Sequence, residues 1–90
     1  MEFEWDAKKA ASNVTTHNVS SDEARTVFGD PLEMTISDDA HSEEARFVSI
    51  GRSESGRLIV VAYTERKDRV RIISARVATP TERRQYESTN

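Results

Sequence analysis

The chain has no cysteine and contains only three glycines, two prolines and one tryptophan among its 90 residues. The absence of cysteine excludes disulfides, thiolate zinc sites and cysteine nucleophiles, and it fits a reducing cytosol. The longest apolar run, residues 58–62, is far too short to span a bilayer, and no apolar signal-peptide segment follows the acidic start. We therefore expect one cytoplasmic domain over residues 1–90, with a frayed tail at residues 88–90.

Acidic and basic residues are unevenly distributed along the chain, although the net charge is only −3. Residues 1–45 contain three basic and eleven acidic side chains, whereas residues 46–90 contain ten basic and five acidic ones. This separation is compatible with a basic surface that binds phosphate and an acidic surface that faces solvent or a cationic partner. Solvated arginines in a strand-rich half would give the same pattern, so both interpretations remain open.

The first part of the chain predicts a strand followed by a helix. Residues 2–5 alternate polar and apolar side chains, and Asp6 then occupies the position of a helix N-cap. The helix should run to about Thr16. Small apolar side chains fall on one of its faces, which we expect to lie against a sheet, and these are Ala7, Ala10, Ala11 and Val14.

Two further helices and a series of strands follow. Ser20 and Glu23 have the spacing of a capping box, which predicts a second, short helix. Alternating patterns then predict four strands, at residues 32–37, 47–52, 57–65 and 69–77. Thr79, Pro80 and Glu82 give a strong start signal for a last helix. The expected order is β-α-α-β-β-β-β-α, an α+β fold with helices packed against an antiparallel sheet.

Regularly spaced arginines mark the last predicted strand and the helix after it. Simple alternation places Val70, Ile72, Ser74 and Arg76 on one face of this strand. The other face would carry Arg69, Arg71, Ile73, Ala75 and Val77. Since Arg76 comes just before the last helix, it should be able to share a site with side chains of that helix. Arginines grouped in this way suit an anionic ligand, such as a phosphodiester.

Residues 3–87 also contain a specific combination of spaced sequence blocks. In the first half these are Phe3, Glu4, Trp5, Asp6, Lys8, Asn13, His17, Val19, Ala24, Val27, Phe28, Asp30 and Pro31. In the second half they are His41, Ser42, Glu44, Arg46, Phe47, residues 50–52, residues 64–66, residues 71–76, Ala78 and residues 82–87. The combination resembles the BrnT toxins of bacterial type II toxin–antitoxin systems. Two positions depart from that pattern: Asn18 replaces a common glycine, and Ser21 replaces an apolar residue.

The resemblance implies a compact RelE-like fold and a ribonuclease activity that blocks translation. It implies RNA cleavage by the 2′-hydroxyl of the RNA, with no metal or other cofactor. It also implies neutralisation by BrnA, a small ribbon-helix-helix antitoxin that would bind operator DNA within a hetero-oligomer. The alternative is a catalytically inactive antitoxin-binding module that acts in operon autoregulation. A nucleic-acid-binding domain without an obligate partner is less favoured, because the negative total charge should weaken non-specific binding.

Four residues are candidates for the chemistry of RNA cleavage. Arg76 and Arg83 are expected to stabilise the phosphorane, because a planar guanidinium binds two phosphate oxygens. His17 and Tyr86 are candidates for proton transfer. A histidine at a helix C-terminus and a core aromatic residue are equally good interpretations of these two residues. Basic residues expected to bind the substrate are Lys8, Arg66, Arg71 and Arg84.

Three other residues are not expected to take part in the chemistry. Glu82 is explained by its capping role. His41 lies in an acidic loop, but the loop lacks the ligand spacing of a metal site, so no metal is expected. Trp5 is expected in the core.

Overall fold

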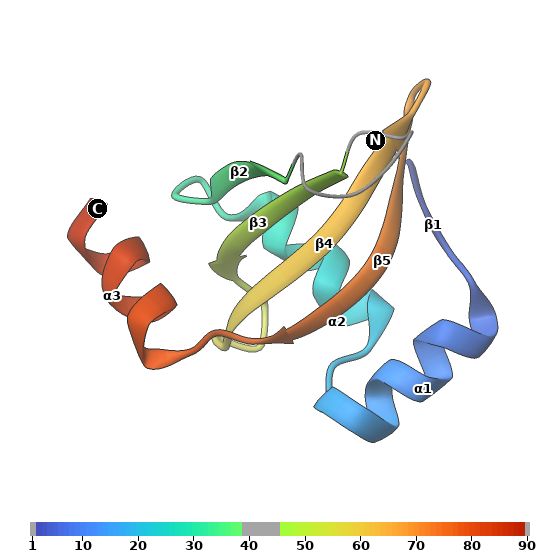
Figure 1. Cartoon of the computed structure of the whole chain (residues 1–90), viewed down its shortest axis with the longest axis horizontal. Helices are drawn as coiled ribbons and strands as arrows, with labels where there is room; N and C mark the ends of the chain where they lie inside the picture. The colour runs from blue at the N-terminus through green and yellow to red at the C-terminus, as the bar shows by residue number, and fades with distance from the viewer. Residues whose placement is uncertain (1, 39–45, 90) are drawn as a thin grey trace.

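The computed structural model describes residues 2–38 and 46–89, and Figure 1 shows how they are arranged. The elements are β1 (Glu2–Trp5), α1 (Ala7–His17), α2 (Ser21–Thr26), the 3-10 helix η1 (Val27–Gly29), β2 (Met34–Asp38), β3 (Arg46–Arg52), β4 (Leu58–Arg66), β5 (Arg69–Val77) and α3 (Pro80–Thr89). The predicted order is confirmed, with η1 as an extension of the second helix. The predicted loop that contains His41 lies outside the described residues.

The five strands form one sheet in the order β1-β5-β4-β3-β2 (Figure 1). Strands β2 to β5 form the antiparallel meander that the sequence predicted. The sheet as a whole is mixed rather than antiparallel, because β1 pairs in parallel with β5. Parallel neighbours cannot be joined by a tight turn. In the sequence, β1 and β5 are separated by all the elements from α1 to β4.

The predicted helix caps are present. Asp6 accepts a hydrogen bond from the backbone N–H of Lys9 at 3.0 Å, and Ser20 accepts one from that of Glu23 at 3.0 Å. At the end of α1, Asn18 has a φ of 56° and a ψ of 36°, the left-handed conformation that glycine would also adopt. These local signals therefore set where α1 and α2 begin and where α1 ends.

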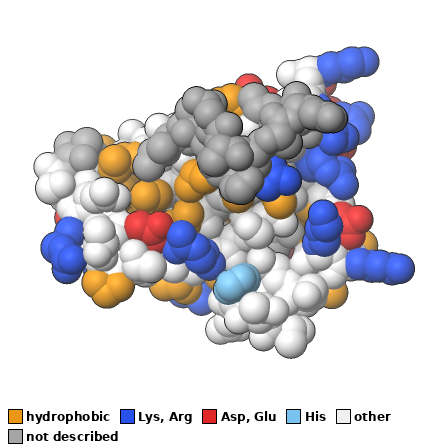
Figure 2. All heavy atoms as spheres, in the orientation of Figure 1, with side chains coloured by type: hydrophobic (Ala, Val, Ile, Leu, Met, Phe, Trp, Pro, Cys, Tyr) orange, Lys and Arg blue, Asp and Glu red, His pale blue; other side chains and the backbone are white. Residues whose placement is uncertain are grey.

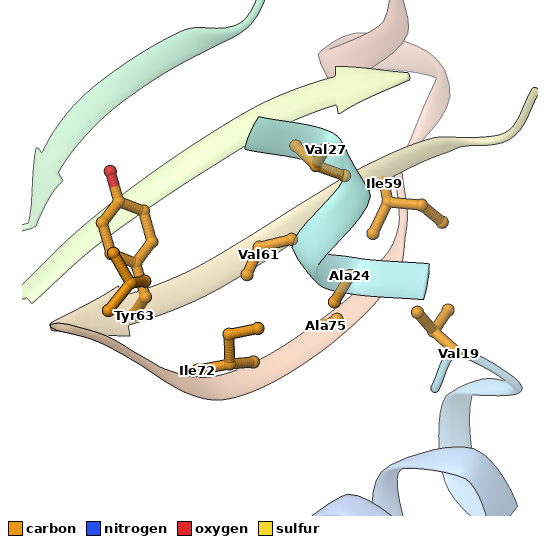
Figure 3. Close-up of a cluster of buried hydrophobic side chains, with 9 residues drawn as sticks. Val19, Ala24, Val27, Ile59, Val61, Tyr63, Ile72 and Ala75 are labelled. Atoms are coloured by element: carbon orange, nitrogen blue, oxygen red, sulfur yellow. The ribbon is translucent and has the colours of Figure 1, made fainter. Parts of the chain in front are cut away.

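Buried apolar side chains pack on both faces of the sheet. On the face covered by α2 and η1, the larger cluster contains Val19, Ala24, Val27, Ile59, Val61, Tyr63, Val70, Ile72 and Ala75 (Figure 3). Trp5 packs against this cluster, as expected. On the other face, α3 contributes Tyr86 to a smaller cluster with Ile50, Leu58 and Val60. The central strand β4 is therefore buried on both sides, which gives the small domain two thin apolar layers.

Helix α1 lies against the sheet with a different face from the one predicted. Val14 is 44% exposed, and Ala7 and Ala11 are exposed as well. The polar side of the helix faces β5 instead, and the carboxamide of Asn13 bonds to the backbone there. The pairing of β1 with β5 ends at Ile72, so the strand edge beyond it offers polar backbone groups to α1. Satisfying these groups explains why a polar face replaces the apolar one.

A β-bulge in β5 changes the predicted assignment of its faces. Tyr63 of β4 pairs with Ile72, but Ala62 pairs with Ser74, so that Ile73 is an extra residue without a partner in β4. The insertion shifts the alternation by one position. Ala75 consequently joins Val70 and Ile72 in the core, and Ser74 and Arg76 lie on the opposite face. The prediction that placed Ser74 and Arg76 with Val70 and Ile72 was wrong because alternation alone cannot detect the bulge.

Candidate functional site

The candidate site lies on the face of the sheet opposite α2, which we call the open face; α3 packs over one part of it. Cross-strand pairing places Arg76 beside Val60, and Arg71 beside Thr64, all with side chains on this face. Figure 1 views the sheet from this side, with α2 behind the strands. Figure 2, in the same orientation, shows basic side chains on this face with acidic ones beside several of them. The arginines are therefore set in a mixed-charge surface.

Arg76 is held in a fixed position by Glu82. Its Nη1 and Nη2 atoms donate to the two carboxylate oxygens of Glu82 at 2.7 and 2.8 Å. Glu82 also accepts from the backbone N–H of Thr79 at 2.9 Å, and its own N–H donates to the Thr79 hydroxyl at 3.2 Å. The residues that cap α3 thus hold the guanidinium of Arg76 in a fixed orientation. The side chain of Arg76 stays 42% exposed, so a ligand on the open face can reach it.

This ion pair changes the proton affinity of both partners. The hydrogen bonds from Arg76 outweigh the effect of burial and lower the pKa of Glu82 to about 2. The same bonds raise the pKa of Arg76. Glu82 is therefore a charged carboxylate at neutral pH and a weak proton acceptor. Its capping role is confirmed, and orientation of Arg76 is added to it.

The arginines at the start of β5 are paired loosely with the acidic strand β1. Arg69 lies 3.6 Å from Glu2 and 3.5 Å from Glu4, and Arg71 lies 3.4 Å from Glu4. Two carboxylates from the first half of the sequence thus partly neutralise two arginines from the second half within the sheet. Long, partly exposed pairs of this kind contribute little stability. The guanidinium of Arg71 can therefore exchange its carboxylate for a phosphate at low cost.

The other predicted arginines lie on α3 and at the β4–β5 hairpin. Arg83 of α3 is 45% exposed and lies 3.9 Å from Glu87, while Arg84 donates to the Thr81 hydroxyl at 3.3 Å. Arg66 is exposed at the β4–β5 hairpin, at the opposite end of β5 from Arg76. Seven residue steps of strand separate these two ends, about 23 Å. The structure therefore does not bring Arg66 to the site of Arg76.

Tyr86 lies in the core beneath α3. Its ring is 4% exposed, and its hydroxyl donates to Asp30 Oδ2 at 2.6 Å. The hydrogen bond to Asp30 raises the pKa of Tyr86, and the guanidinium of Arg52 lies 5.8 Å from the ring centroid. Of the two interpretations that the sequence allowed, this environment matches a core aromatic residue that fastens α3 to the sheet.

His17 and Lys8 lie on α1, beside the sheet. His17 is the last residue of the helix and is exposed. It lines a surface groove between α1 and β5 together with Lys9 and Ser74. Lys8 is exposed but does not line this groove. Ser74 lines the groove that contains His17, and Arg76 lies two residues further along β5 on the same face. The groove and Arg76 are therefore neighbours along this strand.

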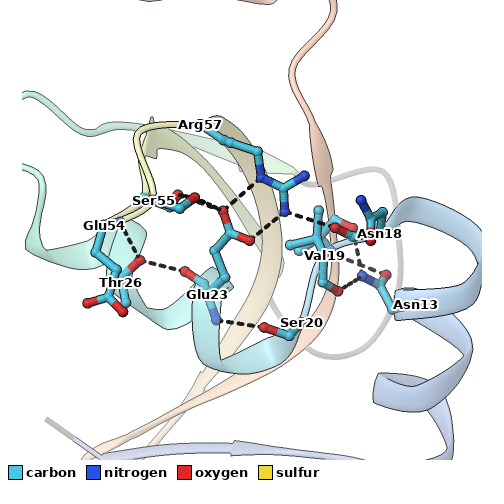
Figure 4. Close-up of polar contacts among 11 residues, drawn as sticks. Asn13, Asn18, Val19, Ser20, Glu23, Thr26, Glu54, Ser55 and Arg57 are labelled. Atoms are coloured by element: carbon cyan, nitrogen blue, oxygen red, sulfur yellow. Dashed lines mark hydrogen bonds and ion pairs between the residues drawn. The ribbon is translucent and has the colours of Figure 1, made fainter.

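Sequence reasoning missed two features near these residues. Lys9 lines the groove four residues before Asn13 and eight before His17, a helical spacing that would have grouped the three. Glu23 was assigned only to a cap, yet its carboxylate also accepts from Ser53 at 2.7 Å, from Ser55 at 2.5 Å and from Arg57 (Figure 4).

The Glu23 network ties three segments together. Arg57 donates from Nε at 3.0 Å and also from Nη2 to Glu23, and Nη2 reaches the carbonyl of Asn18 at 2.8 Å. The hydrogen bonds from Arg57 lower the pKa of Glu23 to about 2. The network joins α2, the end of α1 and the β3–β4 hairpin on the side away from the open face, so we assign it to stability rather than chemistry.

Two further features concern metal binding and membrane insertion. Within residues 2–38 and 46–89, no group of three or more histidine, aspartate or glutamate side chains is arranged to hold a metal ion. No helix in these ranges has the length and apolar character needed to cross a membrane. The predicted acidic loop around His41 is outside these ranges.

Comparison with known proteins bears on the same fold. The family model described as "Ribonuclease toxin, BrnT, of type II toxin-antitoxin system" matches residues 5–82. Among solved structures, the ribonuclease toxin BrnT of Brucella abortus is similar, with a TM-score of 0.65 and 18% sequence identity. The match covers 88% of this chain and 97% of that one. No curated protein sequence matches the chain. At this identity, the structural likeness concerns the fold.

Proposed function

The chain belongs to the BrnT family of ribonuclease toxins of type II toxin–antitoxin systems, and from this we propose that it cleaves RNA internally without a metal ion. In this reaction the 2′-oxygen of the RNA attacks the adjacent phosphorus and loses its proton to a base. The bond from phosphorus to the 5′-oxygen breaks, and that oxygen takes a proton from an acid. The products are a 2′,3′-cyclic phosphate and a 5′-hydroxyl, so no other reactant is consumed.

The observation that carries this proposal is the geometry of Arg76. The phosphorane has more negative charge on its oxygens than the ground state, so a fixed cation lowers the barrier most when it needs no reorientation. Glu82 supplies this fixation through hydrogen bonds of 2.7 and 2.8 Å. Arg83, one residue after Glu82 on α3, is our second candidate for charge stabilisation, and it is 45% exposed.

Proton transfer is assigned to His17. Neutral imidazole accepts a proton near neutral pH, and His17 is exposed in the groove that adjoins Arg76 through Ser74. Tyr86 is assigned a positioning role, because its hydroxyl donates to Asp30 and its ring lies in the core. The remaining predicted residues would bind the RNA strand on either side through its phosphates: Lys8, Arg66, Arg71 and Arg84.

We further propose that the toxin is neutralised by a BrnA-like ribbon-helix-helix antitoxin. Membership of a type II system supports a protein antitoxin as the partner. A hetero-oligomer of the two would bind operator DNA through the antitoxin. An adjacent reading frame that encodes a short ribbon-helix-helix protein would support this partner, and growth arrest on expression of the toxin alone should be relieved by its co-expression.

The central experiment incubates purified, antitoxin-free protein with RNA in EDTA. We expect internal cleavage that leaves 2′,3′-cyclic phosphate ends, and no cleavage of the same RNA with 2′-O-methyl groups. Arg76→Ala and Arg83→Ala should each lower the cleavage rate about 10²- to 10³-fold, as expected for loss of a group that stabilises developing charge. Arg25→Ala is the matched control, because Arg25 lies on α2, on the other side of the sheet, and among the described residues only its exposed pair with Asp22 is lost.

Each result distinguishes among the proposals. Full cleavage by folded Arg76→Ala and Arg83→Ala variants would overturn the site assignment while leaving the activity in place. Cleavage that stops in EDTA and returns with Mg²⁺ would overturn metal independence. Intact RNA with the wild type, together with tight antitoxin binding, would identify the catalytically inactive module instead.

A further inference from the structure

The groove between α1 and β5 contains His17, and it also contains side chains to which the proposed cleavage reaction gives no role. It has a volume of about 180 Å³ and is lined by Lys9, Ser12, Asn13, Thr16, His17, Ile73 and Ser74. Lys9 and the three hydroxyl residues are exposed. A lysine surrounded by hydroxyl groups, with no carboxylate in the lining, is suited to a phosphate.

The walls of the groove are fixed before any ligand arrives. The amide of Asn13 donates to the carbonyls of Val19 and Ala75 at 2.8 Å each, and its oxygen accepts from the N–H of Ala75 at 3.2 Å. These bonds lock α1 against β5. On the strand side, the bulge at Ile73 turns Ser74 onto the open face. A ligand in the groove would therefore meet a preorganised surface, which reduces the entropy lost on binding.

Lys9 supplies the positive charge of the groove. It is the third residue of α1, and its N–H is the one capped by Asp6. Because the Asp6 carboxylate already occupies the positive end of the helix dipole, the attraction for a phosphate comes from the Lys9 ammonium group and not from the dipole. Within residues 2–38 and 46–89, the ammonium group of Lys9 forms no hydrogen bond or ion pair.

The groove lies next to the proposed cleavage site along β5. Ser74 lines the groove, and Arg76 lies two residues further along β5 on the same face. Two residues of strand span about 7 Å. This spacing is comparable to that between neighbouring phosphates of an extended single strand, so an RNA strand with its scissile phosphate at Arg76 would place an adjacent phosphate at the groove.

We propose that Lys9, with the hydroxyl groups of Ser12, Thr16 and Ser74, forms a binding subsite for the phosphodiester next to the scissile one. The proposal rests on the ribonuclease function and deepens it. The subsite binds the flanking phosphate equally in the ground state and the transition state. It therefore strengthens substrate binding and leaves the chemical step to Arg76 and its neighbours.

The test uses a short single-stranded DNA that carries one ribonucleotide at a position where the wild type cuts natural RNA. Each flanking phosphodiester is replaced in turn by a neutral methylphosphonate. Lys9→Gln should raise KM about 5- to 10-fold with kcat changed less than about 2-fold, as for a lost charged hydrogen bond. Arg25→Gln removes the same charge from α2 and should leave both constants unchanged. Ser74→Ala should raise KM about 2- to 4-fold.

The neutral linkage identifies the phosphate that Lys9 binds. At one flanking position, methylphosphonate should raise the wild-type KM by the same factor as Lys9→Gln, and it should cause no further rise in that variant. The slope of log affinity against log salt for the all-DNA strand should also fall by about 0.7 in Lys9→Gln. Thermal unfolding of each variant serves as the folding control.

Equal KM values and salt slopes for Lys9→Gln and Arg25→Gln would overturn the subsite. So would additive effects of Lys9→Gln and methylphosphonate at every position. Failure of the ribonuclease function looks different: the wild type would leave the ribonucleotide strand intact. In that case a lower salt slope for Lys9→Gln on the all-DNA strand would still support a phosphate site in the groove, and an unchanged slope would overturn it.

Discussion

The side chain of Asn13 makes two hydrogen bonds to Ala75 that a neighbouring strand would otherwise make. Its Oδ1 accepts from the Ala75 N–H at 3.2 Å, and its Nδ2 donates to the Ala75 carbonyl at 2.8 Å. Strand β1 stops pairing with β5 at Ile72, so this carboxamide continues the hydrogen bonding of the sheet edge. The same Nδ2 also donates to the carbonyl of Val19, which fixes the turn into α2.

Asn13→Ala should therefore destabilise the protein strongly. The substitution removes the partner of three backbone groups, and unsatisfied, partly buried groups of this kind cost free energy. We expect the free energy of unfolding to fall by about 2 to 4 kcal/mol. Urea denaturation of the purified protein measures the change. Thr15→Ala is the matched control on the same helix, since the Thr15 hydroxyl is exposed and, within the part of the chain that the structure describes, bonds only to the Ala11 carbonyl at 3.3 Å. Equal stability of the two variants would contradict the role of Asn13.

The features predicted correctly from the sequence are those with local signals. Ser20 with Glu23, and Thr79 with Glu82, form their caps within four residues of chain, and capping depends on side chains and backbone of the same turn. Asn18 adopts a left-handed conformation for the same local reason. The element order follows from these signals together with the alternation of the strands.

The features that the sequence did not predict depend on pairings between distant residues. The bulge at Ile73 exists because Tyr63 and Ala62, which are adjacent in β4, pair with Ile72 and Ser74, which are two positions apart in β5. Without the bulge, strict alternation would put Arg76 on the same face as the core residues Val70 and Ile72. Which face of α1 points toward the sheet depends on where β1 stops pairing with β5. The ion pair of Arg76 with Glu82 depends on the path of the chain from β5 into α3. No periodicity within one element contains this information.

Acid should destabilise the protein through Glu23 and Glu82. Each carboxyl has a pKa of about 2 in the folded chain, against 4.5 ordinarily. Between these values the unfolded chain binds more protons than the folded one, so stability falls as pH decreases. The contribution of each group is complete above about pH 5 and lost near pH 2, and it amounts to about 1 to 3 kcal/mol per group after allowance for solvent screening.

The measurement is the urea midpoint at pH 7, 4 and 3. Glu23→Gln and Glu82→Gln should each lower stability at pH 7 and flatten its decline towards pH 3, because the titrating group is gone. Glu54→Gln is the control, since Glu54 is exposed in the β3–β4 turn. A double Glu23→Gln, Glu82→Gln variant that loses as much stability on acidification as the wild type would show that other carboxyls dominate.

Gly51 should not tolerate a larger side chain. A Cβ atom at this position would lie 2.8 Å from Val27 Cγ1 and 3.2 Å from the Val27 carbonyl oxygen. Because backbone as well as side chain is too close, η1 would have to move away from β3. We expect Gly51→Ala to lower stability by about 1 to 3 kcal/mol. Gly29→Ala is the matched control, because no atom of residues 2–38 and 46–89, its chain neighbours aside, lies within 4 Å of the added atom there, and its effect should stay within about 0.5 kcal/mol.

Tyr86→Phe separates a positioning role from a catalytic one. The ring stays in its cluster, but the 2.6 Å hydrogen bond to Asp30 is lost. Asp30 retains backbone donors from Leu32 at 2.9 Å and Arg52 at 2.7 Å, so its charge is still partly compensated. We expect a loss of about 1 to 2 kcal/mol in stability.

The effect of Tyr86→Phe on RNA cleavage should be small at a temperature where the variant is folded. Removal of a proton donor lowers the rate about 10²- to 10⁴-fold, whereas a loosened α3 should lower kcat less than about 10-fold. Asp30→Asn is the companion variant, because it weakens the same hydrogen bond from the other side. In a double-mutant cycle of stability, Tyr86→Phe should cost less in the Asp30→Asn background. Loss of cleavage with unchanged stability would instead identify the Tyr86 hydroxyl as a proton donor, because only a group acting on the substrate separates activity from folding in this way.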